Sequence, residues 1–469
     1  MKIGYKIIAT GALFLLAFTA QSQSVVDQKT KSIMKNPLLQ KSILQYQAPQ
    51  FDLIKDEHFK PAFEYGLKVH DKEIEAIANN NLKPTFENTV LALEISGVDL
   101  YRAVGIFSNL TGSNTNPTLQ AIDEEYAPIF SAHNDKIYLN SKLYQRIKSI
   151  DINSLEGEDK KLTEYYIQQF ELAGANLSPE NKEKMKKINS ELAVLGTSFG
   201  NKLLIARKKG AVLFDKESDL DGLSADELAA SKVRAKEAGH EGKYLIGLLN
   251  TTQQPLLPSL KNRATREKIY KSSWTRAEKN DDGDTREILL KMAKLRLQKA
   301  KLMGKKSYAE WRLQDQMAKT PANAMNLLAQ IAKPAVAKAK VEAKEIQDLI
   351  DSQNGGFKLQ PWDWNFYSEQ VRKAKYDLDE SQIKPYFELT TVLEKGVFFA
   401  AKQMFGITFK ERKDLPVYNP DVVAYEVFDN DGVNGSKSAK TQLMTFKAPT
   451  KDEANEKTEK NNSEIKNDI

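Results

Sequence analysis

Apolar residues recur at steps of three and four along most of this sequence, and that spacing constrains the fold more than any other feature. Ser178 suits a helix N-cap, and Pro179 suits the first helical position. One apolar face follows them, made of Met185, Ile188, Leu192, Leu195, Phe199 and Leu203. Because helical residues three and four apart share a face, the pattern predicts a long amphipathic helix.

Two further segments show the same periodicity. A helix is predicted over 284–303, with Gly304 as its stop signal. Another is predicted over 322–352, where Pro334 removes a backbone donor and is expected to kink or split the helix.

Strand signals are few. Residues 244–249 form a short apolar run, and 422–428 (VVAYEVF) is rich in β-branched and aromatic residues. The sequence therefore predicts a mainly α fold, a large multi-helix assembly with a few short strands.

Composition narrows the chemistry. The 469 residues contain no cysteine, which excludes disulfides, thiolate metal sites and cysteine nucleophiles within them. The formal net charge is +6, from 69 basic and 63 acidic residues of interspersed sign. Nothing in this distribution indicates a nucleic-acid groove, so no nucleic-acid partner is predicted.

The N-terminal residues have the pattern of a secretory signal. Lys2 and Lys6 precede the apolar run 7–20 (IIATGALFLLAFTA), and a small-x-small step at 20–22 follows it. The run is shorter than the roughly 20 apolar residues that a spanning helix needs. We therefore expect residues 1–22 to be a signal peptide and the mature chain to be exported to the periplasm, with no membrane association after cleavage.

The C-terminal residues differ from the rest. Residues 433–469 are polar, and from Lys447 onwards charged residues alternate with small polar ones and no aromatic occurs. Such a segment cannot bury enough apolar surface to offset its ordering entropy. It is predicted to be a disordered tail, and the region 23–432 to hold the helical fold.

Histidine is scarce, with only His58, His70, His133 and His240. Zinc peptidases use H-E-x-x-H on a helix, which places two imidazoles on one face with a glutamate as base. Here His240-Glu241 is followed by Gly242, Lys243 and Tyr244, so the second ligand is missing and the backbone is expected to be a loop. The other three histidines have no partner at ligand spacing and are expected to play ordinary surface or half-buried roles.

Other site patterns were also weighed. The acidic stretch 278–283 (EKNDDG) resembles the start of a calcium loop, but its twelfth position is Leu289, so an acid-rich helix start is favoured. The aromatic cluster 361–367 (PWDWNFY) is expected to pack a helix start into a core rather than to bind a ligand. No catalytic, cofactor-binding or metal-binding residue is assigned from these patterns.

Several longer stretches resemble the M3 family of zinc metallopeptidases, and within it the peptidyl-dipeptidase (dipeptidyl carboxypeptidase) branch related to oligopeptidase A. They are 36–39 (NPLL), 84–88 (PTFEN), 317–321 (MAKTP), 360–364 (QPWDW), 371–379 (VRKAKYDLD), 383–387 (IKPYF), 405–409 (FGITF), 417–421 (VYNPD) and 426–429 (EVFD). The resemblance runs from about Asn36 to Asp431. It implies a mostly helical fold in two halves around a channel for short peptides, and release of dipeptides from peptide C-termini. It also implies one zinc ion, held by H-E-x-x-H and a downstream glutamate in the C-terminal half.

The sequence departs from the family pattern at that zinc site. No histidine follows His240, so no zinc ligand is transferred and no zinc is expected to bind this chain. The chain resembles the N-terminal portion of such an enzyme and is expected to be inactive alone. The alternative is a non-catalytic helical module that binds peptides or complements a separate C-terminal half. In either case, we expect the strand 422–428 to expose an unpaired edge and some helices to expose apolar faces.

Overall fold

The computed structural model describes residues 35–249, 254–376, 380–428 and 442–447, and these form two compact units. Of the described residues, the first unit contains 35–186, 410–427 and 442–446, and the second contains 187–249, 254–376, 380–409, 428 and 447. The predicted signal peptide lies outside the described residues. No helix in the described part of the chain combines the length and apolar character needed to cross a membrane.

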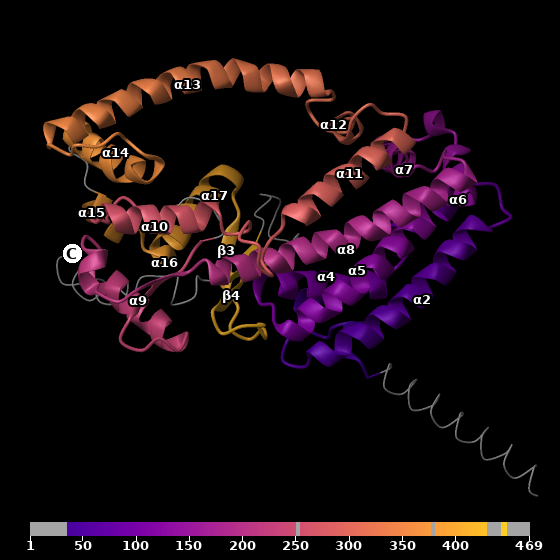
Figure 1. Ribbon diagram of the computed structural model, residues 1–469. Helices are drawn as coiled ribbons and strands as arrows, with labels where there is room; N and C mark the ends of the chain where they lie inside the picture. Colours follow the sequence, from indigo (N-terminus) through magenta and orange to yellow (C-terminus); the bar gives the residue numbers. More distant parts are fainter. Residues whose placement is uncertain (1–34, 250–253, 377–379, 429–441, 448–469) are drawn as a thin grey trace, which may run out of the picture. The chain divides into compact units, whose positions relative to one another are not determined.

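Helices dominate the first unit. They are η1 (Pro37–Leu39), η2 (Gln45–Gln47), η3 (Asp56–His58), α2 (Phe59–Ala78), η4 (Phe86–Leu91), α3 (Ala92–Glu94), α4 (Val98–Ser113), α5 (Pro117–Tyr138), α6 (Ser141–Lys148), η5 (Ile152–Ser154) and α7 (Gly157–Ala173). Helices α2, α4 and α5 pack side by side (Figure 1). Local signals start them: the Asn116 side chain accepts a hydrogen bond from the backbone of Leu119, and Pro117 opens α5.

The core of the first unit is aromatic where these three helices meet. Phe59, Phe63 and Phe107 are almost fully buried, and the Phe107 ring centroid lies 5.1 Å from that of Phe59 and 5.2 Å from that of Phe63. Edge-to-face aromatic pairs of this kind add about 0.5–1.5 kcal/mol beyond the area they bury. This packing fixes the position of α2 against α4, and His70 of α2 contacts Tyr101 of α4 nearby.

The second unit is also mainly helical. Its elements are β1 (Val212–Phe214), η6 (Glu217–Leu220), α9 (Ala225–Glu237), β2 (Tyr244–Ile246), α10 (Arg263–Trp274), α11 (Arg286–Leu302), α12 (Tyr308–Arg312), α13 (Pro321–Ser352), α14 (Pro361–Tyr376), α15 (Glu380–Ile383), η7 (Lys384–Phe387), α16 (Leu389–Thr391), η8 (Val392–Phe398) and α17 (Phe399–Phe405). Strands β1 and β2 pair antiparallel, with Leu213 opposite Leu245. The prediction of a mainly α fold with a few short strands is confirmed.

The long predicted helices are present. Helix α8 (Pro179–Lys209) begins where predicted, and the Ser178 hydroxyl accepts a hydrogen bond from the backbone of Asn181. Helix α13 continues through Pro334 as one element, so of the two expected outcomes, a kink or a split, the split does not occur. Proline removes only one backbone hydrogen bond, and a 32-residue helix has many others to hold it together.

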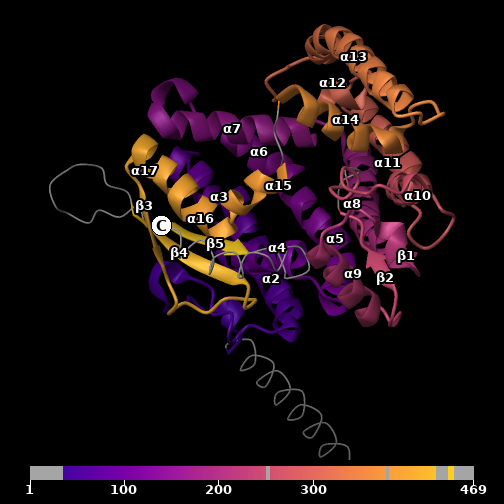
Figure 2. The same cartoon turned by 90° about the vertical axis from the view of Figure 1, so that its left-hand side faces the viewer.

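The three-stranded sheet corrects a second expectation. Its strands are β3 (Thr408–Glu411), β4 (Val422–Phe428) and β5 (Gln442–Lys447), in the order β3-β4-β5 (Figure 2). Strand β4 has the predicted bounds but lies between two neighbours, so it does not expose an unpaired edge. Strand β5 falls inside the stretch predicted to be a tail, and the rest of that stretch lies outside the described residues.

Helices α10 and α14 are joined by a buried ion cluster. Asp363 is fully buried, and its carboxylate accepts hydrogen bonds from Arg266 Nη2 at 3.0 Å and from Arg263 Nη2 at 2.9 Å. The Arg266 guanidinium is also buried and lies over the Phe366 ring, 4.2 Å from its centroid. The Asp363 carboxylate therefore balances only one of the two arginine charges, and aromatic side chains pack around the cluster.

We expect Asp363→Ala to lower the free energy of unfolding by about 3–5 kcal/mol, because it leaves buried arginine charge without a partner. Urea unfolding followed by circular dichroism measures this loss. Asp348→Ala on α13, which removes an exposed ion pair with Lys344, is the matched control and should cost no more than about 1 kcal/mol. Equal losses in the two variants would contradict a dominant role for the buried cluster.

Candidate functional site

His240 and Glu241 lie in an exposed turn. Helix α9 ends just before them, and the His240 backbone N–H donates to the Ala235 carbonyl oxygen at 2.8 Å. Gly239 and Gly242 on either side both have positive φ, of 82° and 83°. This geometry confirms the predicted loop and explains the pair as a helix ending before a strand.

His58 has a local structural role. It ends η3, and its Nδ1 accepts a hydrogen bond from the Lys55 backbone N–H at 3.0 Å. The side chain thereby satisfies one of the backbone donors left open at a helix start. The prediction of an ordinary half-buried role agrees with this placement.

His70 and His133 form a buried pair of titratable groups in the first unit, which sequence reasoning missed. His70 lies on α2 and is 1% exposed, and His133 lies on α5 and is 5% exposed. His133 Nε2 lies 2.9 Å from His70 Nδ1, and His133 Nδ1 lies 2.9 Å from Asp71 Oδ1. The expectation that each is a lone histidine is therefore wrong, because 63 residues of sequence separate partners that the packing of α2 on α5 brings together.

The far side of the His70 ring is equally enclosed. His70 Nε2 lies 3.0 Å from the hydroxyl of Ser96, which in turn lies 2.7 Å from the Leu93 carbonyl oxygen. Gly97 follows with a φ of +70°, and its N–H donates to the Glu73 carboxylate at 2.8 Å. A Cβ atom at Gly97 would lie 2.7 Å from His70 Nδ1, so only glycine allows the backbone to approach the ring this closely.

Burial sets the electrostatics of the pair. It lowers the pKa of His70, and the neighbouring His133 lowers that pKa further. Burial also lowers the pKa of His133, although the Asp71 carboxylate partly offsets the effect. Both rings therefore favour the neutral form more than an exposed histidine does.

The remaining sequence candidates have structural explanations. In the acidic loop 278–283, Asp282 forms an ion pair with Lys209, and Asp284 just beyond it binds Arg286 at 2.5 Å. Arg286 opens α11 and Glu287 is the acidic residue of its first turn, so the stretch 278–283 lies in the loop before the helix. The aromatic cluster 361–367 forms the first turns of α14, and Tyr367 packs with Ile346 and Ile350 of α13, which confirms the core assignment.

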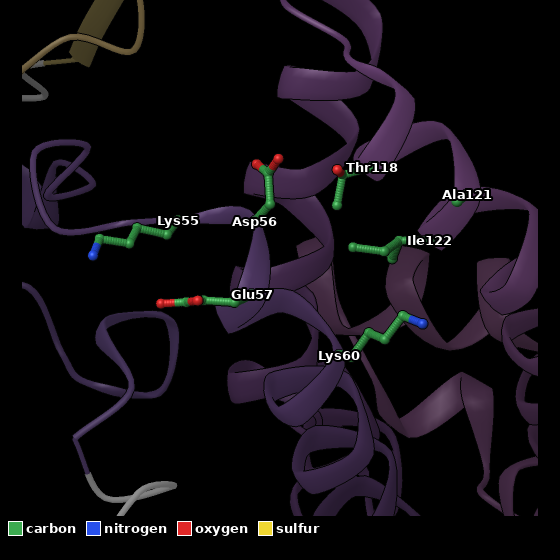
Figure 3. Close-up of a pocket in the computed structure, with 7 residues that line it drawn as sticks. All are labelled: Lys55, Asp56, Glu57, Lys60, Thr118, Ala121 and Ile122. Atoms are coloured by element: carbon green, nitrogen blue, oxygen red, sulfur yellow. The ribbon is translucent and has the colours of Figure 1, made fainter.

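A hollow lies beside the start of α2. Its volume is about 530 Å³, and it is lined by Lys55, Asp56, Glu57, Lys60, Thr118, Ala121 and Ile122. Figure 3 shows Lys55 and Glu57 extending to one side, while Thr118 and Ile122 belong to the facing helix. Asp56 accepts a hydrogen bond from Asn116 at 2.9 Å, and Lys60 pairs with Glu125. Opposite charges are balanced in this lining, so it defines no substrate class.

The described residues do not fit a zinc ion. Nowhere among them do three or more His, Asp or Glu side chains converge as metal ligands. The facing nitrogens of His70 and His133 are engaged with each other at 2.9 Å, so they cannot both bind one ion. No catalytic step through a metal follows from these residues.

Comparison with known proteins places this fold in a class. Residues 256–442 match the family described as Peptidase family M3, a family of zinc metallopeptidases. The chain thus carries an M3 peptidase region, and the resemblance predicted from its motifs is confirmed.

The similar proteins specify a branch of that class. Over 402 residues the chain is 47% identical to a dipeptidyl carboxypeptidase of Salmonella typhimurium and equally to one of Escherichia coli. Oligopeptidase A of Escherichia coli is 30% identical over 415 residues. The sequence therefore matches the peptidyl-dipeptidase branch of the family.

The alignments cover a larger share of this chain than of its relatives. They include 85% of this chain but 59% of each dipeptidyl carboxypeptidase, and 86% of this chain but 60% of oligopeptidase A. The chain thus spans less than two thirds of the length of these relatives.

Gly97→Ala tests the close approach of backbone to His70. We expect the variant to lose about 1–3 kcal/mol of unfolding free energy, because alanine is strained at positive φ and its methyl group displaces the ring. Gly105→Ala is the control, since an added Cβ there meets nothing within 4 Å inside α4. The control should gain about 0.5–1 kcal/mol. A Gly97→Ala protein as stable as the wild type in urea would contradict this interpretation.

Proposed function

We propose that this chain forms the larger part of an exported peptidyl-dipeptidase that releases dipeptides from the C-termini of short peptides. The observation that carries the proposal is the 47% identity to dipeptidyl carboxypeptidases over 402 residues, together with the M3 match over 256–442. An identity of this size extends over most of the chain rather than over one motif.

We propose further that these 469 residues do not hydrolyse peptides by themselves. The M3 chemistry rests on a zinc ion that lowers the pKa of its bound water, and that ion needs imidazole and carboxylate ligands. The chain has four histidines, of which His58 and the His70–His133 pair are engaged with protein atoms and His240 lies in an exposed turn. Zinc ligands must then come from a protein segment outside these residues.

Two apolar surfaces of the second unit support such a partner. Along α13, six apolar side chains are each more than half exposed: Met325, Leu327, Leu328, Ile331, Val336 and Val341. The segment from η7 to α17 adds Tyr386, Phe387, Val397, Phe399, Met404 and Phe405, also more than half exposed. Large apolar side chains left exposed in such number support a site that another protein surface covers. This agrees with the expectation of exposed apolar helix faces.

Complementation tests the proposed activity. The purified chain with zinc should leave a fluorescence-quenched peptide intact, because it lacks the metal ligands. Adding the portion of the Salmonella typhimurium enzyme that lies outside the aligned region should restore cleavage two residues from the peptide C-terminus, and a chelator should abolish it. That portion alone serves as the control. Cleavage by the chain alone, or none in the mixture, would contradict the proposal.

The apolar face of α13 offers a matched pair of variants for the same assay. Leu328→Glu combined with Ile331→Glu places charge on that face and should weaken complementation at least tenfold. Leu82→Glu changes an exposed leucine of the first unit and should leave complementation unchanged.

Export rests on the N-terminal pattern alone and has its own test. Expressed in a Gram-negative host, the protein should be recovered from the periplasm with Gln23 at its N-terminus, as measured by mass spectrometry. Leu15→Arg interrupts the apolar run and should keep the full-length protein in the cytoplasm. Ser24→Arg, beyond the predicted cleavage step, should still be exported. Full-length wild-type protein in the cytoplasm would contradict the proposal.

A further inference from the structure

The four groups Asp71, His133, His70 and Ser96 form a continuous row of hydrogen-bonding atoms inside the first unit. The distances along the row are 2.9, 2.9 and 3.0 Å, and the Ser96 hydroxyl continues it to the Leu93 carbonyl oxygen at 2.7 Å. A neutral imidazole has one donor and one acceptor nitrogen, so each ring can pass a hydrogen bond in either direction. The ends of the row fix which directions are allowed.

Without an extra proton, all bonds run toward Asp71. The ionised carboxylate only accepts, so His133 Nδ1–H donates to it, and His133 Nε2 must then accept from His70 Nδ1–H. His70 Nε2 in turn accepts from the Ser96 hydroxyl. The single hydroxyl proton of Ser96 is then used, and the Leu93 carbonyl oxygen, 2.7 Å away, receives no hydroxyl donor.

One extra proton completes the row. When His133 carries it, both of its nitrogens donate, one to Asp71 and the other to His70 Nδ1. His70 then holds its own proton on Nε2 and donates to Ser96, and the Ser96 hydroxyl donates to Leu93. Every contact in the row is now a donor–acceptor pair, and the imidazolium faces a carboxylate.

A second proton cannot be held in this geometry. With both rings charged, two N–H groups would face each other across the 2.9 Å between His133 Nε2 and His70 Nδ1. Two cations would also lie side by side in a buried site, where their repulsion is strong.

The charged groups around His70 and His133 do not allow the pair to hold a second proton. Helix α2 supplies Asp71, which Lys136 of α5 already neutralises at 2.6 Å, and Glu73, whose carboxylate binds the Gly97 N–H. Helix α4 supplies Tyr101, whose ring stacks edge-on to His70, and burial together with nearby Glu94 raises the pKa of that phenol, so it stays neutral. Glu94 is itself bonded to Tyr166 at 2.6 Å.

We propose that the Asp71–His133–His70–Ser96 row is a one-proton switch built into the first unit. Uptake of a single proton reverses the bonds from His133 to Ser96 without breaking the row, and a second proton breaks it and opens the packing of α2 on α4 and α5. The switch makes the first unit sensitive to acid independently of any peptidase activity.

The direction of the pH effect follows from the lowered pKa of both rings. An unfolded histidine takes up its proton near pH 6.5, whereas the folded rings do so only at lower pH. The stabilising contribution of the neutral rings is therefore fully present above about pH 6.5 and is lost as pH falls below that value. The melting temperature should be constant from pH 8 to 7 and fall between pH 6.5 and 5.5.

Nitrogen-15 NMR of histidine-labelled protein tests the switch directly, since the chain has only four histidines. In the folded protein at pH 8, His70 should be the Nδ1-protonated tautomer. As pH falls, His133 should gain one proton while His70 changes to the Nε2-protonated tautomer at the same pH, and the folded signals should disappear before His70 is charged. Two fully charged rings in the folded protein would overturn the proposal, as would a His70 tautomer that does not change.

Ser96→Ala is the conservative variant. The substitution removes one hydrogen bond from the neutral row and two from the row that carries one extra proton. The midpoint pH of the tautomer change should therefore fall by about 0.5–1 unit. Ser149→Ala is the matched control, because the Ser149 hydroxyl also donates to the carbonyl three residues earlier, at 2.8 Å, without contacting a histidine. An unchanged tautomer midpoint in Ser96→Ala would overturn the proposal.

A double variant, His70→Gln with His133→Gln, tests the link to stability. Hydrogen–deuterium exchange of peptides from α2, α4 and α5, corrected for intrinsic rates, should no longer accelerate between pH 6.5 and 5.5. His240→Gln should keep the wild-type acceleration. If the double variant keeps it too, the proposal is overturned, and if it does not fold, the wild-type NMR titration decides.

Discussion

Both units depend on the burial of apolar helix faces, because the chain has no cysteine and no disulfide can stabilise either unit. In the first unit, Phe59, Phe63 and Phe107 lock α2 onto α4. In the second, Ile346 and Ile350 of α13 pack against Tyr367 of α14. Each fully buried side chain of this size contributes about 1.5–3 kcal/mol, so a few such contacts set where each helix lies.

Polar groups trapped by that packing define the specific features of the fold. Asp363 is enclosed where α14 meets α10, and its carboxylate is paired with the Arg263 and Arg266 guanidinium groups. His70 and His133 are enclosed where α2 meets α5, and they are bonded to each other because a buried polar group costs free energy unless it has a hydrogen-bond partner. The Asp363 cluster holds α10 and α14 in one arrangement. The His70–His133 pair can carry its protons on different ring nitrogens.

The family relationship and the surface of the second unit are consistent with one another. A chain that is 47% identical to dipeptidyl carboxypeptidases aligns with 59% of their length, and its α13 and η7–α17 segments carry exposed apolar side chains. Soluble proteins rarely leave surface of that kind uncovered. One proposed partner segment would thus supply the zinc ligands that the family chemistry needs and would also cover these exposed side chains.

Local and periodic signals were sufficient to predict much of this protein. The helix start at Ser178, the strand 422–428 and the loop at His240 depend on neighbouring residues alone, and the M3 resemblance depends on the order of residues in long motifs. Contacts between distant residues decided the rest. The His70–His133 pair and the Arg263 and Arg266 partners of Asp363 require segments dozens of residues apart to meet, and the position of β4 depends on pairing with two other strands. No local pattern encodes which segments meet. The helix continues through Pro334 for a different reason, since the other backbone hydrogen bonds of a 32-residue helix hold it together.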